Sequence, residues 1–368
     1  MSVKHALKST EMSFFVQLRR RSPTRGQQMP KRSPATIEQI AAWDNLVLAT
    51  YRAAKGKRTR PVVARFLNDL VPNLRSLQSG LLSGSLDLGH GSRFEIFDPK
   101  RRTIHAPAFR ERVLHHAIIR HVGPVLEKSL VADTFACRIG KGSLAAVRRA
   151  QQHSRRFTWF GKLDVRKYFA SIDHGILMGL SRRKFKNPRL LDLFEQILNA
   201  SPVRPGLGLP IGALTSQNFA NFYLAGFDRF LQEKMPARGM VRYMDDVAWW
   251  CDTKEQATSV AAEAEEFLRS KLSLRIRQPM QVNRSVHGIS FCGYRIYPGV
   301  IRLLRRRRRR YAEARKRWET RFHLGLINES ALQAAYSSVL SMTLHADATE
   351  WRRRELLLRP PVEEYRDV

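Results

Sequence analysis

Tyr243-Met244-Asp245-Asp246 is the stretch from which the fold of this chain can be predicted. It lies between two β-prone, largely apolar runs, Gly239 to Arg242 and Val247 to Cys251, so the sequence predicts a β-hairpin with the acidic pair at its turn. Two adjacent carboxylates repel each other, and a cation between them removes the repulsion. For an isolated Asp-Asp pair, an exposed polar turn is the simpler interpretation. The choice depends on whether a third carboxylate and a nucleic-acid-binding surface occur elsewhere.

The composition indicates such a surface. The 368 residues include 65 Lys and Arg against 32 Asp and Glu, a formal net charge of +33 with a pI near 11.1. A chain so far from neutrality repels itself, and the usual compensation is a polyanionic partner. The sequence has no apolar run of roughly eighteen or more residues, the length that spans a bilayer, so nucleic acid is the expected partner and a membrane is not. The widely spaced cysteines and a poor signal-peptide pattern predict a reducing, cytoplasmic location.

A third carboxylate follows another predicted strand. The run Phe157 to Val165 is β-rich, and Asp164 lies among its apolar residues without a capping role, whereas Asp173 can cap the helix after it. A strand aspartate combined with an Asp-Asp turn is what a bound divalent cation requires. Asp164, Asp245 and Asp246 are therefore the predicted catalytic residues of two-metal phosphoryl transfer. Two Mg²⁺ ions, or Mn²⁺ as a substitute, would activate a primer 3′-hydroxyl and stabilise the leaving pyrophosphate.

Three further segments are suited to phosphate contact. Residues 94–105 alternate around a Pro-containing turn, which predicts a hairpin whose basic tip either clamps a triphosphate or is simply solvated. The Gly-Lys-Gly loop at Lys141 opens a helix and presents N–H groups to a nucleic-acid backbone, without the spacing of a P-loop. Gly206 to Gly212 is a glycine-rich loop of close backbone approach.

Six consecutive arginines, Arg305 to Arg310, begin the most basic segment of the chain. Apolar residues recur at helical spacing after them, at Tyr311, Ala314, Trp318 and Phe322. The pattern predicts a helix with one apolar stripe and a dense basic surface, suited to following a duplex backbone. A disordered tail or a localisation signal is the simpler interpretation of a charge run.

A histidine cluster, His115, His116 and His121, lies on another predicted helix. Adjacent histidines point to different helix faces, and no carboxylate accompanies them at ligand spacing. Packing rather than metal binding is therefore expected for this cluster.

Taken in order, these segments resemble a reverse transcriptase. The resemblance spans roughly Ala41 to Arg317 and includes the family's first catalytic block, its nucleotide-contacting block, its YxDD block and its FLGY-type hairpin, in this chain Leu163 to Phe169, Gly208 to Gln217, Tyr243 to Asp246 and Phe291 to Tyr294. Within the family the chain is most similar to reverse transcriptases of diversity-generating retroelements, on four segments: Asp98 to Lys100, Ala106 to Ala117, Ala136 to Gly142 and Gly208 to Gln217.

The resemblance implies an α+β, right-hand polymerase fold with fingers, a palm built on an antiparallel sheet flanked by helices, and a helical basic thumb. The expected regions are a flexible basic arm, N-terminal helices with fingers, a palm with some fingers elements, and the thumb with the C-terminal tail, at residues 1–35, 36–160, 161–298 and 299–368. The implied activity is RNA-directed DNA synthesis from a DNA or RNA primer and dNTPs. The template would be a template-repeat RNA copied with errors at adenine, and the implied partner is a small basic accessory protein.

The resemblance also assigns residues to the site. Metal contact is expected from Asp164, Val165, Asp245 and Asp246. Nucleotide contact is expected from six residues, with Phe169 as a steric gate against a 2′-hydroxyl: Arg102, Phe169, Ile211, Gly212, Gln217 and Tyr243. Nucleic-acid contact is expected from Lys100, Arg112, Lys141, Arg305, Arg306 and Arg309.

Two positions depart from the family's pattern. Ile211 replaces the usual Gln of the LPQG-type block, so an amide that can hydrogen-bond near the incoming nucleotide is lost and the misincorporation spectrum is expected to depend on this residue. The Lys that the family often carries before the FLGY-type hairpin, as a candidate general acid, is absent from Gln281 to Ser290. That role has no candidate from the sequence.

Other classes stay open. A group II intron, retron or phage-defence reverse transcriptase is the alternative enzyme, although the segment after the arginine run is too short for the maturase and endonuclease regions common in intron-encoded enzymes. A catalytically inactive RNA-binding protein is the alternative from the binding class. It predicts a damaged carboxylate set, whereas Asp164, Asp245 and Asp246 are all present.

Overall fold

The computed structural model describes residues 32–97, 101–200 and 204–360. The chain divides into two units, Met1–Ser33 and Pro34–Val368, and the second is described below. The expected basic arm at 1–35 therefore lies almost entirely outside the described residues, as does Lys100. None of the described helices is both long and apolar enough to cross a membrane.

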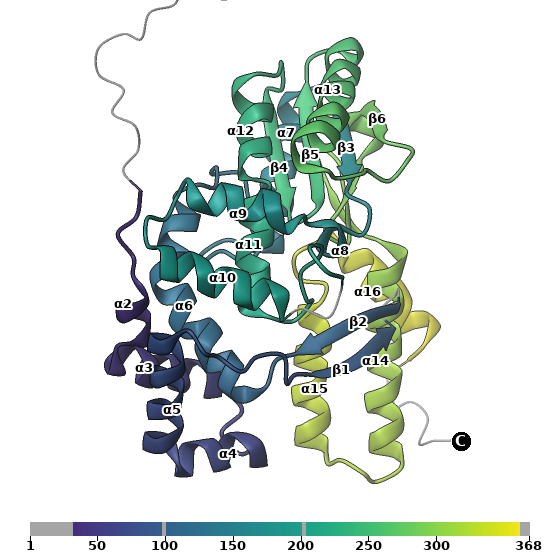
Figure 1. Cartoon of the computed structure of the whole chain (residues 1–368). Helices are drawn as coiled ribbons and strands as arrows, with labels where there is room; N and C mark the ends of the chain where they lie inside the picture. The colour runs from purple at the N-terminus through teal and green to yellow at the C-terminus, as the bar shows by residue number, and fades with distance from the viewer. Residues whose placement is uncertain (1–31, 98–100, 201–203, 361–368) are drawn as a thin grey trace, which may run out of the picture. The chain divides into compact units, whose positions relative to one another are not determined.

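A four-stranded antiparallel sheet, called the central sheet below, lies in the upper part of Figure 1. Its strands, in the order in which they are hydrogen-bonded, are β4 (Gly239–Tyr243), β5 (Asp246–Cys251), β3 (Trp159–Asp164) and β6 (Gln281–Arg284). Helices cover both faces, and these are α7 (Ser143–Arg156), α12 (Ala225–Glu233) and α13 (Lys254–Leu272). This arrangement confirms the predicted antiparallel sheet flanked by helices.

Alternation along β5 explains why both faces of the sheet are covered. Val247, Trp249 and Cys251 belong to the same buried cluster as α13, whereas Ala248 and Trp250 belong to the cluster that includes α7. Successive side chains of a strand point to opposite faces, so an uninterrupted apolar strand needs a layer on each side. The two indole N–H groups are also satisfied, by Ala257 O at 3.2 Å for Trp249 and by Ser154 Oγ at 3.1 Å for Trp250.

A hairpin and a helical group precede the sheet. The hairpin pairs β1 (Ser92–Phe97) with β2 (Arg101–Ala106), as predicted for 94–105. The helices are α2 (Ile37–Ala41), α3 (Trp43–Ala54), α4 (Pro61–Asn68), α5 (Leu70–Ser83) and α6 (Phe109–Glu127). A capping box between Thr36 and Gln39 begins α2 by satisfying its first N–H groups.

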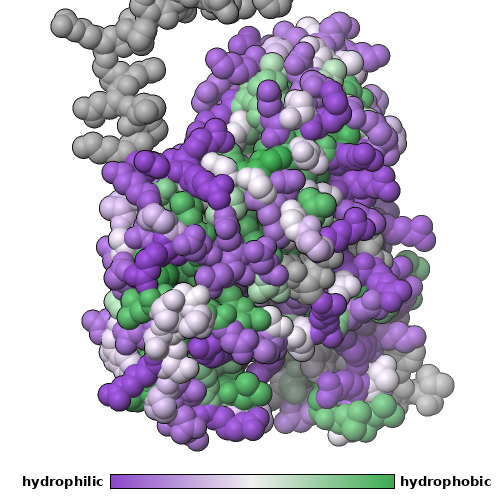
Figure 2. Space-filling model, viewed as in Figure 1, coloured by the Kyte–Doolittle hydropathy of each residue, from purple (hydrophilic) through white to green (hydrophobic). Residues whose placement is uncertain are grey.

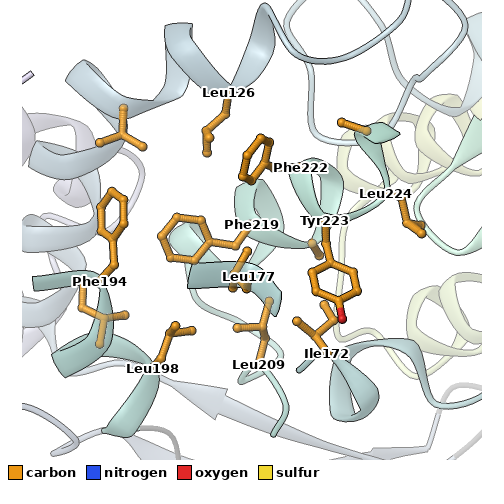
Figure 3. Close-up of a cluster of buried hydrophobic side chains, with 14 of the residues drawn as sticks. Leu126, Ile172, Leu177, Phe194, Leu198, Leu209, Phe219, Phe222, Tyr223 and Leu224 are labelled. Atoms are coloured by element: carbon orange, nitrogen blue, oxygen red, sulfur yellow. The ribbon is translucent and has the colours of Figure 1, made fainter. Parts of the chain in front are cut away.

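Further helices lie between β3 and β4 in the chain, and these are α8 (Tyr168–Ser171), α9 (His174–Arg182), α10 (Pro188–Asn199) and α11 (Leu214–Tyr223). Figure 3 shows Phe219, Phe222 and Tyr223 of α11 among buried leucines and Phe194 of α10. The aromatic residues of α11 are therefore part of the hydrophobic core.

The C-terminal part begins with a small antiparallel sheet, β7 (Ile289–Phe291), β8 (Tyr294–Ile296) and β9 (Ile301–Leu303), and continues with α14 (Arg305–His323), α15 (Glu329–Ser341) and α16 (Thr349–Leu358). The predicted arginine-rich helix is thus confirmed as α14. Its stripe residues Tyr311 and Ala314 are buried with Val339 of α15, and Trp318 packs against them. Hydrophilic side chains dominate the face of the molecule in Figure 2, as the net charge of +33 leads one to expect.

Candidate active site

The register of the central sheet brings the three aspartates together. Asp164, the last residue of β3, is paired directly with Asp246, the first residue of β5. Tyr243 pairs with Asp246 across the β4–β5 hairpin, so Met244 and Asp245 form a two-residue turn. Met244 has a φ of 57°, the positive value that such tight hairpin turns require. Directly opposed residues share a face, so the Asp164 and Asp246 carboxylates meet where β3 ends and β5 begins, beside Asp245.

Burial and charge repulsion perturb Asp245. Its pKa is raised to about 6, chiefly by desolvation and also by the charge and a side-chain hydrogen bond of the neighbouring Asp164. A backbone hydrogen bond and the positive charge of Arg102 act in the opposite direction. Arg102 lies on β2, so the basic hairpin acts electrostatically on the acidic turn.

Asp246 is perturbed in the same direction. Its pKa is raised to about 6, chiefly by burial and also by the charges of Asp245 and Asp164, while Lys162 acts in the opposite direction. The Asp246 side chain is 27% exposed as a whole, but its Oδ1 atom is buried, and its charged neighbour is Lys162. Three neighbouring carboxylates supply the oxygen donors that Mg²⁺ prefers.

The described side chains do not by themselves form a closed cluster of three or more His, Cys, Asp or Glu ligands. Two basic side chains form ion pairs with these carboxylates. Lys162 Nζ lies 3.0 Å from Asp246 Oδ1, and Arg277 Nη1 lies 3.0 Å from Asp164 Oδ2. The oxygen-rich donor set fits divalent cations, with these ion pairs neutralising the carboxylates in the arrangement described. Val165 is buried and its side chain has no donor atom, so its main-chain carbonyl is the only group of this residue that can act as a metal ligand.

Neither basic residue belongs to the set predicted from sequence. The position of Lys162 could have been predicted from the sequence, because it precedes Asp164 by two positions on β3 and therefore points to the same face. Arg277 had none. It reaches the site because the segment before β6 returns to β3, where the Arg277 N–H donates to Asp164 O at 2.8 Å.

The glycine-rich loop meets the β1–β2 hairpin. The His105 N–H donates a 2.8 Å hydrogen bond to Ile211 O, so the loop continues the edge of β2. Gly212 follows with a φ of 129°, and a Cβ there would lie 2.3 Å from His105 O. The predicted close backbone approach is confirmed at this residue, and it places Ile211 and Gly212 beside the strand that carries Arg102.

The remaining predicted nucleotide residues have mixed surroundings. Phe169 is half-buried, packs against the core, and makes an edge-on contact with Tyr168 at 5.8 Å. Gln217 Oε1 lies 3.6 Å from Cys137 Sγ at the start of α11. Tyr243 is half-buried, and burial raises its pKa. Core packing and nucleotide contact are both compatible with these positions.

The residues predicted to contact nucleic acid divide into two groups. Arg112 Nη2 donates to Ala53 O at 3.2 Å, and Lys141 Nζ donates to Ala132 O at 2.6 Å, so both also have structural roles. The side chains predicted on α14 are exposed, at Arg305, Arg306 and Arg309.

Two other arginines of the run attach α14 to its neighbours. Arg307 lies 4.2 Å from the ring centre of Tyr294 and donates to Cys292 O, and Arg308 lies 5.7 Å from the ring centre of Trp351. The helix therefore presents part of its arginine run outward and uses the rest for packing.

The histidine cluster is not a ligand set among the described residues. His115 is buried, its Nδ1 lies 3.1 Å from Thr215 Oγ1, and burial lowers its pKa to about 4. The packing expected from the sequence is thus observed for His115.

The sheet, the carboxylates and the order of the blocks define a nucleic-acid polymerase domain. The reverse transcriptase (RNA-dependent DNA polymerase) family matches residues 98–295, more than half of the chain, and the chain belongs to this family. This is a family of RNA-directed DNA polymerases.

Among individual proteins, the chain is similar to protein YkfC of Escherichia coli (strain K12), 25% identical over 292 residues that cover 67% of this chain and 74% of YkfC. It is also similar to the group II intron-encoded protein LtrA of Lactococcus lactis subsp. cremoris, 26% identical over 143 residues, 37% of this chain and 24% of LtrA. Apo telomerase from Candida tropicalis aligns with a TM-score of 0.42 and 12% identity over 58% of this chain and 55% of that chain. The chain thus matches about a quarter of LtrA.

Proposed function

We propose that this chain extends a nucleic-acid primer on an RNA template by two-metal nucleotidyl transfer. The observation that carries the proposal is the pairing of Asp164 with Asp246, with Asp245 in the adjacent turn. Asp164, Asp245, Asp246 and the main chain of Val165 would hold two Mg²⁺ ions, which when bound activate the primer 3′-hydroxyl and neutralise the leaving pyrophosphate. Mn²⁺ would substitute for Mg²⁺ in this donor set.

The chain's own residues supply positioning and charge. Arg102 acts electrostatically on Asp245, so a triphosphate between them would meet a guanidinium fork on the side opposite the carboxylates. Ile211 and Gly212 would form the adjoining wall, because the His105–Ile211 hydrogen bond joins that loop to β2. Phe169, Gln217 and Tyr243 complete the proposed nucleotide pocket, with Phe169 as the gate against a 2′-hydroxyl.

The proposed division into fingers, palm and thumb follows the same elements. The β1–β2 hairpin and the helices around α6 would be the fingers, the four-stranded sheet the palm, and α14 to α16 the thumb. The exposed arginines of α14 support a path for the nucleic-acid backbone along that helix. Lys100, Arg112 and Lys141 are the proposed contacts on the fingers side.

The subtype is a separate proposal. The segments around Ala106 to Ala117 and Ala136 to Gly142, together with Ile211, support a diversity-generating retroelement enzyme that makes adenine-mutagenised cDNA with a small basic accessory protein. The similarity to LtrA supports the alternative of a group II intron-type enzyme. Primer-extension products sequenced from a defined RNA template separate the two, because errors concentrated at adenine are expected only for the first.

The decisive experiment is primer extension on RNA with Mg²⁺. Asp245→Asn is expected to abolish synthesis and to leave salt-sensitive RNA binding intact, because it removes a ligand and no phosphate contact. Asp252→Asn is the matched control, since Asp252 is an exposed aspartate just after β5 that pairs with Arg238 at 2.9 Å. A wild-type chain that fails to extend on RNA, or an Asp245→Asn variant that extends as fast as wild type, would overturn the proposal.

A further inference from the structure

Arg242, the residue before Tyr243, is fully buried although it carries a charge. Its partner, Asp228 of α12, is equally buried, and both side chains are 0% exposed. The pair is bidentate, with Nε to Oδ1 and Nη2 to Oδ2 each at 2.7 Å. A buried charge is costly unless it is paired and fully hydrogen-bonded, so the other donors of this guanidinium are informative.

Each of those donors has a partner. Nη1 donates to Asn221 Oδ1 at 3.1 Å and to Met244 O at 3.0 Å, and Nη2 also donates to Asn221 O at 3.1 Å. A guanidinium has five N–H groups, and these bonds together with the two to Asp228 account for all of them. The fork therefore joins α12, α11 and the turn of the β4–β5 hairpin.

The cluster is anchored from a further side. Thr134 Oγ1 donates to Asp228 Oδ2 at 2.8 Å, and Asn221 Nδ2 donates to Ala136 O at 2.5 Å. The main chain of Arg242 is held as well, since its N–H donates to Asp133 O at 2.9 Å and its carbonyl accepts from the Phe135 N–H at 2.9 Å. Asp228 and Asn221 are thus fixed acceptors that leave the guanidinium one orientation.

Stability alone does not account for this arrangement. Buried ion pairs can often be replaced by apolar side chains of similar volume with little loss of stability. An apolar pair cannot supply the bond to Met244 O, which lies in the turn between Tyr243 and Asp245. Met244 has a positive φ of 57°, which non-glycine residues disfavour, so an external bond to its carbonyl helps to hold the turn.

We propose that Arg242 is a positioning residue for Asp245. Braced by Asp228 and Asn221, its guanidinium holds the Met244 carbonyl and so fixes the turn in which the Asp245 carboxylate faces Asp164. The inference rests on the proposed two-metal function and adds to it the source of the turn's rigidity. It also couples the acidic turn to α11, the helix that begins at the glycine-rich loop.

The test is Arg242→Lys. An ammonium keeps the charge opposite Asp228, but its single nitrogen cannot reach both Asp228 oxygens, Asn221 and Met244 O together. We expect kcat for primer extension to fall roughly 10- to 100-fold, because displacing a catalytic group by about 1 Å has effects of that order. The Mg²⁺ concentration that gives a half-maximal rise in melting temperature should increase several-fold, and the dissociation constant for primer-template should stay unchanged.

Arg149→Lys is the matched control. Arg149 makes a bidentate pair with Asp133, at 2.8 and 3.1 Å, in the segment adjoining the cluster but without contact to the turn. We expect its kcat and its Mg²⁺ response to equal those of the wild type. If Arg149→Lys loses both to the same degree as Arg242→Lys, the effect is general destabilisation and the inference fails.

A double variant keeps the inference testable if Arg242→Lys does not fold. Arg242→Met with Asp228→Leu replaces the ion pair by apolar side chains and is expected to regain the melting temperature without regaining kcat. Recovery of both would show that the pair serves stability alone and would overturn the inference. The proposed function fails separately, if the wild type does not extend primers on RNA. The inference fails if the wild type extends and Arg242→Lys matches it in kcat and Mg²⁺ response.

Discussion

Lys162 Nζ lies 3.0 Å from Asp246 Oδ1 and donates a 2.6 Å hydrogen bond to Ser290 O. The lysine thus bridges β3 and β7 beside the three aspartates, 5.6 Å from the ring centre of Phe291 in the FLGY-type hairpin. A lysine expected from the segment before that hairpin is absent from the sequence there. The structure brings one to the same hairpin from β3 instead.

Removing this lysine should expose the repulsion among the carboxylates. Lys162→Met leaves Asp246 buried without its ion-pair partner, so we expect the metal-free chain to lose roughly 1 to 3 kcal/mol of unfolding free energy at neutral pH. Added Mg²⁺ should restore part of the loss, because a divalent cation supplies the missing charge. Urea unfolding in EDTA measures the loss of stability, and urea unfolding in Mg²⁺ measures its recovery. Lys271→Met, at an exposed lysine, is the control. Equal losses in the two variants would contradict the expectation.

The raised pKa of Asp246 predicts a pH dependence of stability. The folded carboxyl has a pKa of about 6, above the ordinary value of 3.8, so the folded state holds its proton to higher pH than the unfolded state. Stability of the metal-free wild type should therefore fall, relative to Asp246→Asn, as the pH rises from about 4 to about 6, by about 2 to 3 kcal/mol. Unfolding of both proteins in EDTA across this range gives the difference. A flat difference would show that the carboxyl titrates normally.

Ile211 should influence fidelity rather than folding. Its main chain is held by the 2.8 Å bond from His105, so Ile211→Gln changes the side chain while the loop keeps its attachment to β2. A Gln amide restores a hydrogen-bonding group worth on the order of 1 to 3 kcal/mol of discrimination. We expect a changed misincorporation spectrum opposite template adenine, read by sequencing primer-extension products. Ile139→Gln, at a fully exposed isoleucine, is the control, and an adenine error rate equal to that of wild type in Ile211→Gln would refute the prediction.

The exposed face of α14 should control salt-dependent binding. Replacing Arg305, Arg306 and Arg309 by Gln removes up to three phosphate contacts, and each lost contact should reduce the slope of log K against log salt by about 0.7 to 0.9. Fluorescence anisotropy with a labelled primer-template duplex between low and moderate salt measures the slope. The control is a triple substitution to Gln at three exposed arginines elsewhere: Arg65 on α4, Arg75 on α5 and Arg183 directly after α9. If both triple variants reduce the slope equally, α14 is not the specific binding surface for the nucleic-acid backbone.

Local pattern was sufficient for several elements of the fold. The β4–β5 hairpin was predictable because a strand is encoded by neighbouring apolar residues and its turn by the residues between them. The apolar stripe from Tyr311 to Trp318 predicted α14 for the same reason. Asp164 was recognisable because a carboxylate without a cap role is unusual in an apolar strand.

The site depended on information that no local window contains. Which strand pairs with β5, and in which register, is decided by packing of both sheet faces, and that register sets Asp164 opposite Asp246. Arg242 looked like an ordinary polar residue of a strand, yet it is completely buried because Asp228 and Asn221 converge on it. The sequence by itself determined which carboxylates and which basic helix the chain carries. Only the tertiary structure decided which basic side chains neutralise the carboxylates and which arginine supports the turn, because those partners meet through long-range packing.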